Sequence, residues 1–301
     1  MITNGMLPIL LVVICGFMLG RTNFFNLDSA REMNRVVFFF GMPVLGISIL
    51  TEVDFTLFNF RILISYLAAQ FITGLLGGWL AHSFWHYDLK TSILVGMSTA
   101  LANHVLYVLP IAENLYEGYI ITQITAVIVM DVILVTFVIT FLLEYASNST
   151  ISIKILFKRL LRIPLVLGVL TGLTIAITGI NLPIAILTFL KFSYSCAAPL
   201  ALFALGIILA KSKLTDNLNF ALNISIIKVL IHPVLLAVIG FGVLELSLDD
   251  LKPGLMVAAA PCGAMVLVFA SAYNVDPKPL APLVVISFLL SLPGLALVIF
   301  L

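Results

Sequence analysis

Long apolar stretches alternate with short polar ones along the whole chain. A helix needs about 20 apolar residues to cross the hydrocarbon core of a bilayer, and ten stretches approach that length. We predict membrane-spanning helices over 4–20, 34–51, 61–81, 91–112, 119–143, 163–180, 185–210, 219–244, 254–273 and 280–301. The connections are short, so the pattern predicts an all-α polytopic membrane protein without a large domain outside the membrane.

The fourth and ninth predicted spans contain residues that interrupt a membrane helix. The fourth carries Asn103 and His104 followed by Pro110, and the ninth carries the run Pro261-Cys-Gly-Ala264. A polar side chain in hydrocarbon needs a partner, and a proline removes a backbone donor. We expect helix breaks at Pro110 and Pro261, although a kinked helix with satisfied polar groups is the alternative for either span alone. Matched interruptions in two halves of a chain are typical of a transporter's central site.

Composition supports the membrane assignment and narrows the function. The chain is 62% hydrophobic and 10% charged, with a mean hydropathy of +1.23, far from the usage of soluble domains. The net charge of +1 and the lack of a basic cluster argue against a nucleic-acid partner. The three cysteines have no disulfide or metal spacing, and no hydrolase, metalloprotease or phosphate-loop motif occurs. We therefore expect neither an enzyme nor a metal site.

Lysine and arginine are distributed unequally between the two sets of connections. Eleven of the fifteen lie in connections that follow odd-numbered spans, and only Arg61 and Lys252 lie in the opposite set. Lys191 and Lys228 fall near or within spans, and we expect Lys191 to reach toward the lipid headgroups. Basic residues remain on the cytoplasmic side of membrane proteins, so both termini are predicted to face outward.

The ten predicted spans divide into two halves of five. A shift of 156 positions places Pro8 on Pro164, Gly16 on Gly172 and Pro43 on Pro199. An odd number of spans in each half forces the second to be inverted in the membrane. We therefore predict a first repeat over 1–145, a cytoplasmic connecting segment over 146–162 and a second, inverted repeat over 163–301. The connecting segment is expected to lie at the interface, with its basic side chains toward headgroups, namely Lys154, Lys158, Arg159 and Arg162.

These features resemble the auxin efflux carrier family of membrane transporters, which includes bacterial malonate carriers. The matching text is Gly-Met-Pro43, Ala-Asn103-His, Leu-Pro110-Ile, His-Pro233 and Ala-Ala-Pro261-Cys-Gly. The resemblance implies ten helices in two inverted repeats, with the fourth and ninth broken and crossing at mid-membrane, as in sodium–proton antiporter and bile acid symporter folds. It also implies a secondary carrier of small organic anions, a homodimer, in the bacterial inner membrane.

The residues predicted to bind the substrate lie around the two interruptions. A half-helix N-terminus carries partial positive charge and free N–H groups, so it can hold a carboxylate without a salt bridge. The predicted substrate contacts are Asn103, His104, Met42, Pro43, Ser195, Pro261, Cys262, Gly263 and Ala264. By resemblance, Asn103 clasps the carboxylate. His104 either takes part in a proton-coupled step or packs as a hydrogen-bonded side chain.

Asp131 is the only carboxylate deep within a predicted span, and Gln123 lies on the same helix. Intramembrane acids are candidates for ion or proton coupling, so we assign that role to both residues. The alternative is an Asp131 paired with Lys228 or Lys191, or hydrogen-bonded to a neighbouring helix. No cofactor is expected, and H+ or Na+ are the candidate coupling ions. Two other functions stay open, a receptor that binds without moving its ligand and a passive channel, although no charge ring or filter repeat appears.

Overall fold

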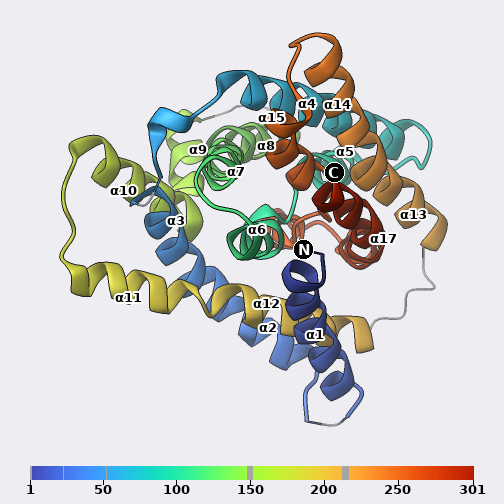
Figure 1. Cartoon of the computed structure of the whole chain (residues 1–301). Helices are drawn as coiled ribbons and strands as arrows, with labels where there is room; N and C mark the ends of the chain where they lie inside the picture. Colours follow the sequence, from blue (N-terminus) through green and yellow to red (C-terminus); the bar gives the residue numbers. More distant parts are fainter. Residues whose placement is uncertain (1, 23, 52, 148–151, 212–216) are drawn as a thin grey trace.

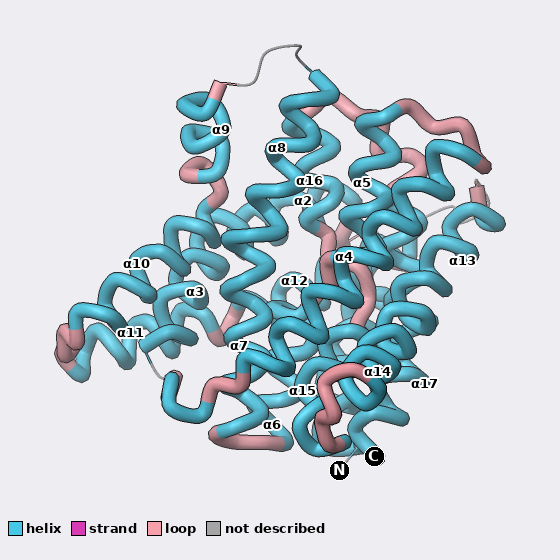
Figure 2. Tube along the Cα trace, turned by 90° about the horizontal axis from the view of Figure 1, so that it is seen from above, coloured by secondary structure: helices cyan, strands magenta, loops and turns pink. Residues whose placement is uncertain are grey.

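The computed structural model describes residues 2–22, 24–51, 53–147, 152–211 and 217–301, and this part of the chain is helical nearly throughout (Figure 1 and Figure 2). It forms no β-strand; one isolated bridge joins Ala102 to Cys262. Lys213, which the charge count above includes, and residues 148–151 of the predicted connecting segment lie outside the described residues.

The helices follow the predicted apolar stretches. In chain order they are α1 (Ile2–Gly20), α2 (Leu27–Val36), α3 (Met42–Thr51), α4 (Phe60–Ser83), α5 (Leu89–Ala100), α6 (Leu109–Leu115), α7 (Tyr119–Met130), α8 (Thr136–Ser147), α9 (Ile153–Leu160), α10 (Pro164–Thr178), α11 (Ile184–Tyr194), α12 (Ala197–Lys211), α13 (Leu218–Ile226), α14 (His232–Gly242), α15 (Leu248–Ala258), α16 (Met265–Ala272) and α17 (Ala281–Phe300). Short turns join several of them, namely the π turns η1 (Val37–Gly41), η3 (His104–Val108), η4 (Asp131–Val135) and η5 (Ile227–Ile231), while the 3-10 turn η2 (Phe55–Leu57) precedes α4.

Six helical runs of the described chain are long and apolar enough to cross a membrane, and the pair α9 and α10, bent by 85°, makes a possible seventh. The protein is therefore an all-helical polytopic membrane protein. The remaining predicted spans are α1 and the two interrupted ones, α5 with α6 and α15 with α16. Each piece of an interrupted span is shorter than a full crossing, which is why length and composition alone do not count them.

Three helices accommodate a proline through a wide π turn. The turns η1, η3 and η5 each end two residues before a proline, namely Pro43, Pro110 and Pro233. Proline lacks an N–H and its ring clashes with the preceding turn, and one extra residue in that turn lets the helix continue. Pro110 therefore lies inside a continuous helix, and the prediction that it breaks the fourth span is wrong. The break lies at residues 101–103, before His104.

The helices form two groups, each of which packs mainly within itself. The scaffold group contains α1–α3 and α10–α12, in which α1 lies along α12 and α10 lies along α3 (Figure 1). The crossing group contains α4–α8 and α13–α17, with α4 packed on both α5 and α14. Glycines in the scaffold group let backbones touch: a Cβ on Gly16 would lie 2.1 Å from the carbonyl oxygen of Phe203, and one on Gly168 2.2 Å from that of Pro43. Close packing of this kind is how membrane helices associate without a hydrophobic driving force.

Gly168→Ala should destabilise the scaffold group, because the added methyl meets backbone that cannot move aside. Overpacking of this kind costs about 1–3 kcal/mol. Gly242→Ala is the matched control, since a Cβ at Gly242 meets nothing within 4 Å. Thermal unfolding of the purified variants in detergent measures the difference. Equal melting temperatures for the two variants would contradict this account of the packing.

Candidate functional site

The two interrupted helices meet at their gaps, residues 101–103 (the first gap) and residues 259–264 (the second gap). The backbone amide of Asn103 donates to the carbonyl oxygen of Pro261 at 2.8 Å, and the amide of Gly263 donates to the carbonyl oxygen of Leu101 at 3.4 Å. The gaps thus form a short antiparallel pair. Each gap bonds backbone groups that the other one frees, as hydrocarbon requires.

Asn103 begins the second piece of the fourth span. Its side chain is half-buried and makes no hydrogen bond in the described structure. The next three amides, of residues 104–106, start the helix and have no carbonyl one turn back within it. Asn103 therefore combines an unpartnered amide side chain with a helix N-terminus, where partial positive charge favours an anion.

The second gap offers fewer free donors than predicted. The amide of Cys262 donates to Ser287 Oγ at 3.1 Å, and the amide of Gly263 is bonded to the first gap. Of the three amides proposed to face the substrate, only that of Ala264 has no acceptor among the described residues, and Ala264 is exposed. Pro261 is buried within the gap. Cys262 thus contacts α17 through Ser287.

Asp131 and His104 come together beside the first gap. Asp131 Oδ2 lies 2.8 Å from His104 Nε2, although the ring N–H is not aligned for a hydrogen bond. Gln70 Nε2 donates to Asp131 Oδ1 at 2.7 Å and also to the carbonyl oxygen of Ala100 at 3.3 Å. The three polar side chains are all buried. Asp131 therefore contacts the start of the second half-helix through His104 and the end of the first through Gln70.

Sequence reasoning did not identify Gln70 as a site residue. The available signal was modest: Gln70 is the only amide or charged side chain between Arg61 and the end of the third predicted span. Such a residue is expected to face the interior of a helix bundle, because lipid offers it no partner. The position of Asp131, 61 residues away in sequence, decides which interior face that is.

Lys228 and His232 form a second buried polar pair, near the second gap. Lys228 Nζ lies 2.9 Å from His232 Nδ1 and donates to the carbonyl oxygen of Ala258 at 3.3 Å. Lys228 is 1% exposed and His232 is fully buried. The structure thus places Lys228 at the end of α15, beside the second gap, with His232 next to it.

Four other predicted site residues lie outside the two gaps. Gln123 does not contact Asp131: its Nε2 donates to Leu57 O at 2.7 Å and its Oε1 accepts from the amide of Asn59 at 3.1 Å, so it holds the loop before α4. Met42 and Pro43 are half-buried in the scaffold group. Ser195 is exposed, and its hydroxyl donates to the carbonyl oxygen of Lys191 in its own helix at 2.6 Å.

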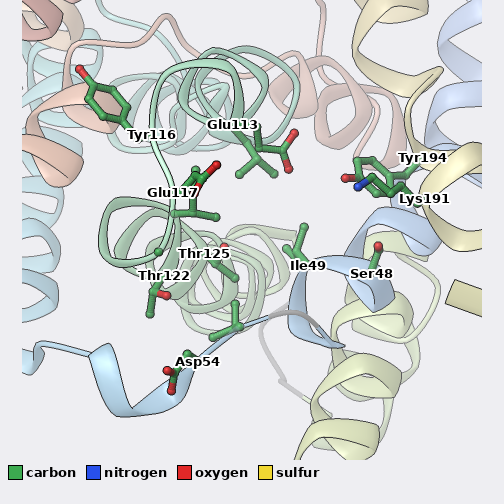
Figure 3. Close-up of a pocket in the computed structure, with 14 residues that line it drawn as sticks. Ser48, Ile49, Asp54, Glu113, Tyr116, Glu117, Thr122, Thr125, Lys191 and Tyr194 are labelled. Carbon is green, nitrogen blue, oxygen red and sulfur yellow. The ribbon is translucent and has the colours of Figure 1, made fainter. Parts of the chain in front are cut away.

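A cavity of about 490 Å³ lies between the two groups (Figure 3). Helices α3 and α11 of the scaffold group and α6 and α7 of the crossing group line it. Its lining residues, some of them in the adjoining loops, include Asp54, Glu113, Glu117, Thr125, Lys191 and Tyr194. Lys191 and Tyr194 lie together on one side of the space, facing Glu113 (Figure 3). Thr125 is 1% exposed, and its hydroxyl has no hydrogen-bond partner. Lys191 is therefore one of the residues that line the cavity.

A family model described as membrane transport protein matches residues 1–299, almost the whole chain. The chain belongs to this family, that of the auxin efflux carriers. The resemblance seen in the sequence is thus confirmed at the level of the family, and the protein is an integral membrane transporter. No curated protein matches the chain.

Ser287→Ala should destabilise this transporter, because it removes the acceptor of the Cys262 amide in the second gap. A buried donor left unpaired costs about 1–3 kcal/mol. Ser98→Ala is the control, since the hydroxyl of Ser98 is equally buried but bonds only the carbonyl of Leu94 in its own helix, at 2.9 Å. Thermal unfolding of both variants measures the effect. A Ser287→Ala variant as stable as the control would show that the second gap does not depend on α17.

Proposed function

We propose that this protein is a secondary active carrier of small organic anions, such as mono- or dicarboxylates, that works by alternating access. The substrate carboxylate is held where the two gaps meet. The observation that carries the proposal is Asn103, a half-buried amide side chain without a partner at the start of a half-helix. An amide and the first-turn N–H groups together suit a carboxylate, and no protein cation is needed to hold it.

A likeness between the two halves supports the proposed ten spans in two inverted repeats, 1–145 and 163–301. The turn after α4 and the turn after α14 share three backbone bonds, 159 residues apart: Phe84 to Leu80, Trp85 to Leu80 and Tyr87 to Ala81, then Val243 to Ile239, Leu244 to Ile239 and Leu246 to Gly240. His86 and Glu245, at the same offset, both have positive φ, 55° and 50°. The scaffold group follows the same symmetry, because α1 packs on α12 while α10 packs on α3.

The two helix groups correspond to the fixed and moving parts of such a carrier. The gaps belong to the crossing group, and the cavity separates that group from the scaffold group. We take the scaffold group as fixed, and as the contact of a proposed homodimer in a bacterial inner membrane. Movement of the crossing group along it would carry the gaps, and the anion bound there, from one side to the other.

The two ends of the crossing group differ in a way that suits alternating access. In Figure 2, α17 finishes at one end of the crossing group and α9 lies at the other end. There Arg159 Nε lies 2.6 Å from Glu144 Oε1, and the Tyr273 hydroxyl donates to the same oxygen at 3.0 Å. Arg159 thus ties α9 to α8 and α16, instead of facing headgroups as predicted.

The charge of the cavity favours proton coupling. Asp54, Glu113 and Glu117 line it, and Lys191 is the one cation among the lining residues that the structure describes. An excess of carboxylates repels a free anion and concentrates protons or other cations. An anion entering with a proton meets a smaller barrier than one entering alone. Asp131, joined to His104 at the first gap, is the residue to which we assign the coupled proton.

Asn103→Ala should weaken carboxylate binding while the protein stays folded. A hydrogen bond to a charged group contributes about 1.5–3 kcal/mol, which corresponds to roughly 10- to 150-fold in affinity. Asn223→Ala is the control, because the exposed Asn223 amide bonds only the Asn219 carbonyl of its own helix, at 2.7 Å. Ligand-dependent thermal shift with malonate and related acids measures binding, and uptake into proteoliposomes measures transport.

The same two measurements separate the carrier from the other candidate functions. A carrier shows saturable uptake that Asn103→Ala reduces together with binding. A receptor binds the acid without flux, and a channel passes it without saturation. Unchanged binding and uptake in the Asn103→Ala variant would remove the gaps from substrate recognition.

Asp131→Asn should abolish the dependence of uptake on pH. The variant keeps the shape of the side chain and an acceptor for Gln70, but its amide cannot take up a proton. Asp28→Asn is the control, since Asp28 pairs with Arg31 at 2.7 Å on the exposed surface. Uptake rates in proteoliposomes at several pH values, with and without sodium, test the role. If the variant retains the full pH and sodium dependence, Asp131 has no part in coupling.

A further inference from the structure

Each gap leaves the C-terminal end of a half-helix inside the membrane. The last carbonyl groups of such an end have no partner within the helix, and the end carries partial negative charge. Half-helix C-terminal ends and unwound carbonyls are where carriers coordinate their coupling cation. In this protein the two ends are Ala100 of α5 and Ala258 of α15, and a side chain from another helix contacts the carbonyl group of each.

The two ends are held in the same way by different chemical groups. At α5, the neutral amide of Gln70 donates to the Ala100 carbonyl at 3.3 Å. At α15, the ammonium of Lys228 donates to the Ala258 carbonyl, also at 3.3 Å. The donors are 158 residues apart, and so are the two acceptors. One half of the protein thus uses an amide where the other half uses a cation.

The positive charge at Lys228 is not needed to hold the helix end, because Gln70 does this without one. A buried ammonium is costly unless its surroundings compensate it. The titratable groups that act on Lys228 are His232 at 2.9 Å on the same long helix, the Cys262 thiol of the second gap, and Asp131 across the site. The ring of His232 in turn packs against Tyr66 at 5.3 Å between centroids. Intramembrane charges of this kind are functional candidates.

We propose that Lys228 is a built-in cation that occupies the coupling-cation position at the C-terminal end of α15. The ammonium takes the place of a sodium ion, so the protein binds its anion without sodium. In its protonated form it also adds a positive charge beside the gaps, which draws the substrate carboxylate to them. The role in transport rests on the proposed carrier function, whereas occupancy of the helix end does not.

Thermal unfolding of the full-length protein tests occupancy without any transport. Wild type should melt at the same temperature in sodium chloride and in choline chloride of equal ionic strength. Lys228→Ala should melt lower, and sodium or methylammonium should restore part of the loss by filling the vacated position. Lys228→Gln should melt near wild type, because glutamine does the same work at residue 70. Lys211→Ala is the control, since Lys211 donates to the Thr22 carbonyl at 3.4 Å on the exposed surface.

Uptake by Lys228→Gln, which keeps the helix-end contact, tests the role of the charge even if Lys228→Ala does not fold. We expect carboxylate affinity about tenfold lower or more, in sodium and in choline alike, because glutamine fills the position without supplying a charge. Stabilisation of wild type by sodium, an unrescued Lys228→Ala, or a Lys228→Gln variant with wild-type affinity would each overturn the proposal. If wild type moves no carboxylate at all, the carrier function fails, and the melting experiment still decides whether Lys228 occupies the cation position.

Discussion

The requirement that backbone polar groups be bonded inside the protein governs the centre of this molecule. Residues 101–103 and 259–264 leave their helices inside a membrane protein, and lipid cannot supply the hydrogen bonds that they lose. They satisfy one another, through the bonds from Asn103 to Pro261 and from Gly263 to Leu101. Each gap depends on the other for these hydrogen bonds. The two halves of the chain are therefore joined at the breaks in their helices. Polar side chains nearby donate hydrogen bonds to the carbonyl groups at the ends of the broken helices, and so satisfy them in the same way.

The two groups of helices meet that requirement by different means. In the scaffold group, continuous helices satisfy their own backbone and approach through glycine, as Gly16 does at Phe203 and Gly168 at Pro43. In the crossing group, polar side chains from neighbouring helices reach the broken ends, as Gln70 does at Ala100 and Lys228 at Ala258. Close apolar packing suits the scaffold group, whose helices we take as fixed. Polar contacts around the gaps suit the crossing group, whose hydrogen bonds could be exchanged for bonds to the proposed ligand.

Buried charge is concentrated where the two halves meet. Asp131 and His104 lie beside the first gap, and Lys228 and His232 lie beside the second. Each such group is costly in a low-dielectric interior, and the cost is tolerated because partners are close and the helix ends complement the charge. The two gaps therefore carry different ionisable side chains. In the two repeats that we propose, the first gap has a carboxyl group beside it and the second has an amine.

The sequence alone determined the membrane class, the course of the helices and the family, because apolar length and the positions of proline and glycine are local properties. It also located Asn103 and Pro261, whose residue types favour a helix start and a helix stop wherever they occur. It misplaced the first break, since Pro110 can remain in a helix once a π turn precedes it, and the run before Asn103 consists of good helix formers. Only the tertiary structure decided that Gln70 donates a hydrogen bond to Asp131, that Gln123 bonds the loop before α4, and that Lys191 lines a cavity. Those partners lie on other segments of the chain. Which partner a polar side chain faces depends on how the helices pack, and the order of residues along one helix does not carry that information.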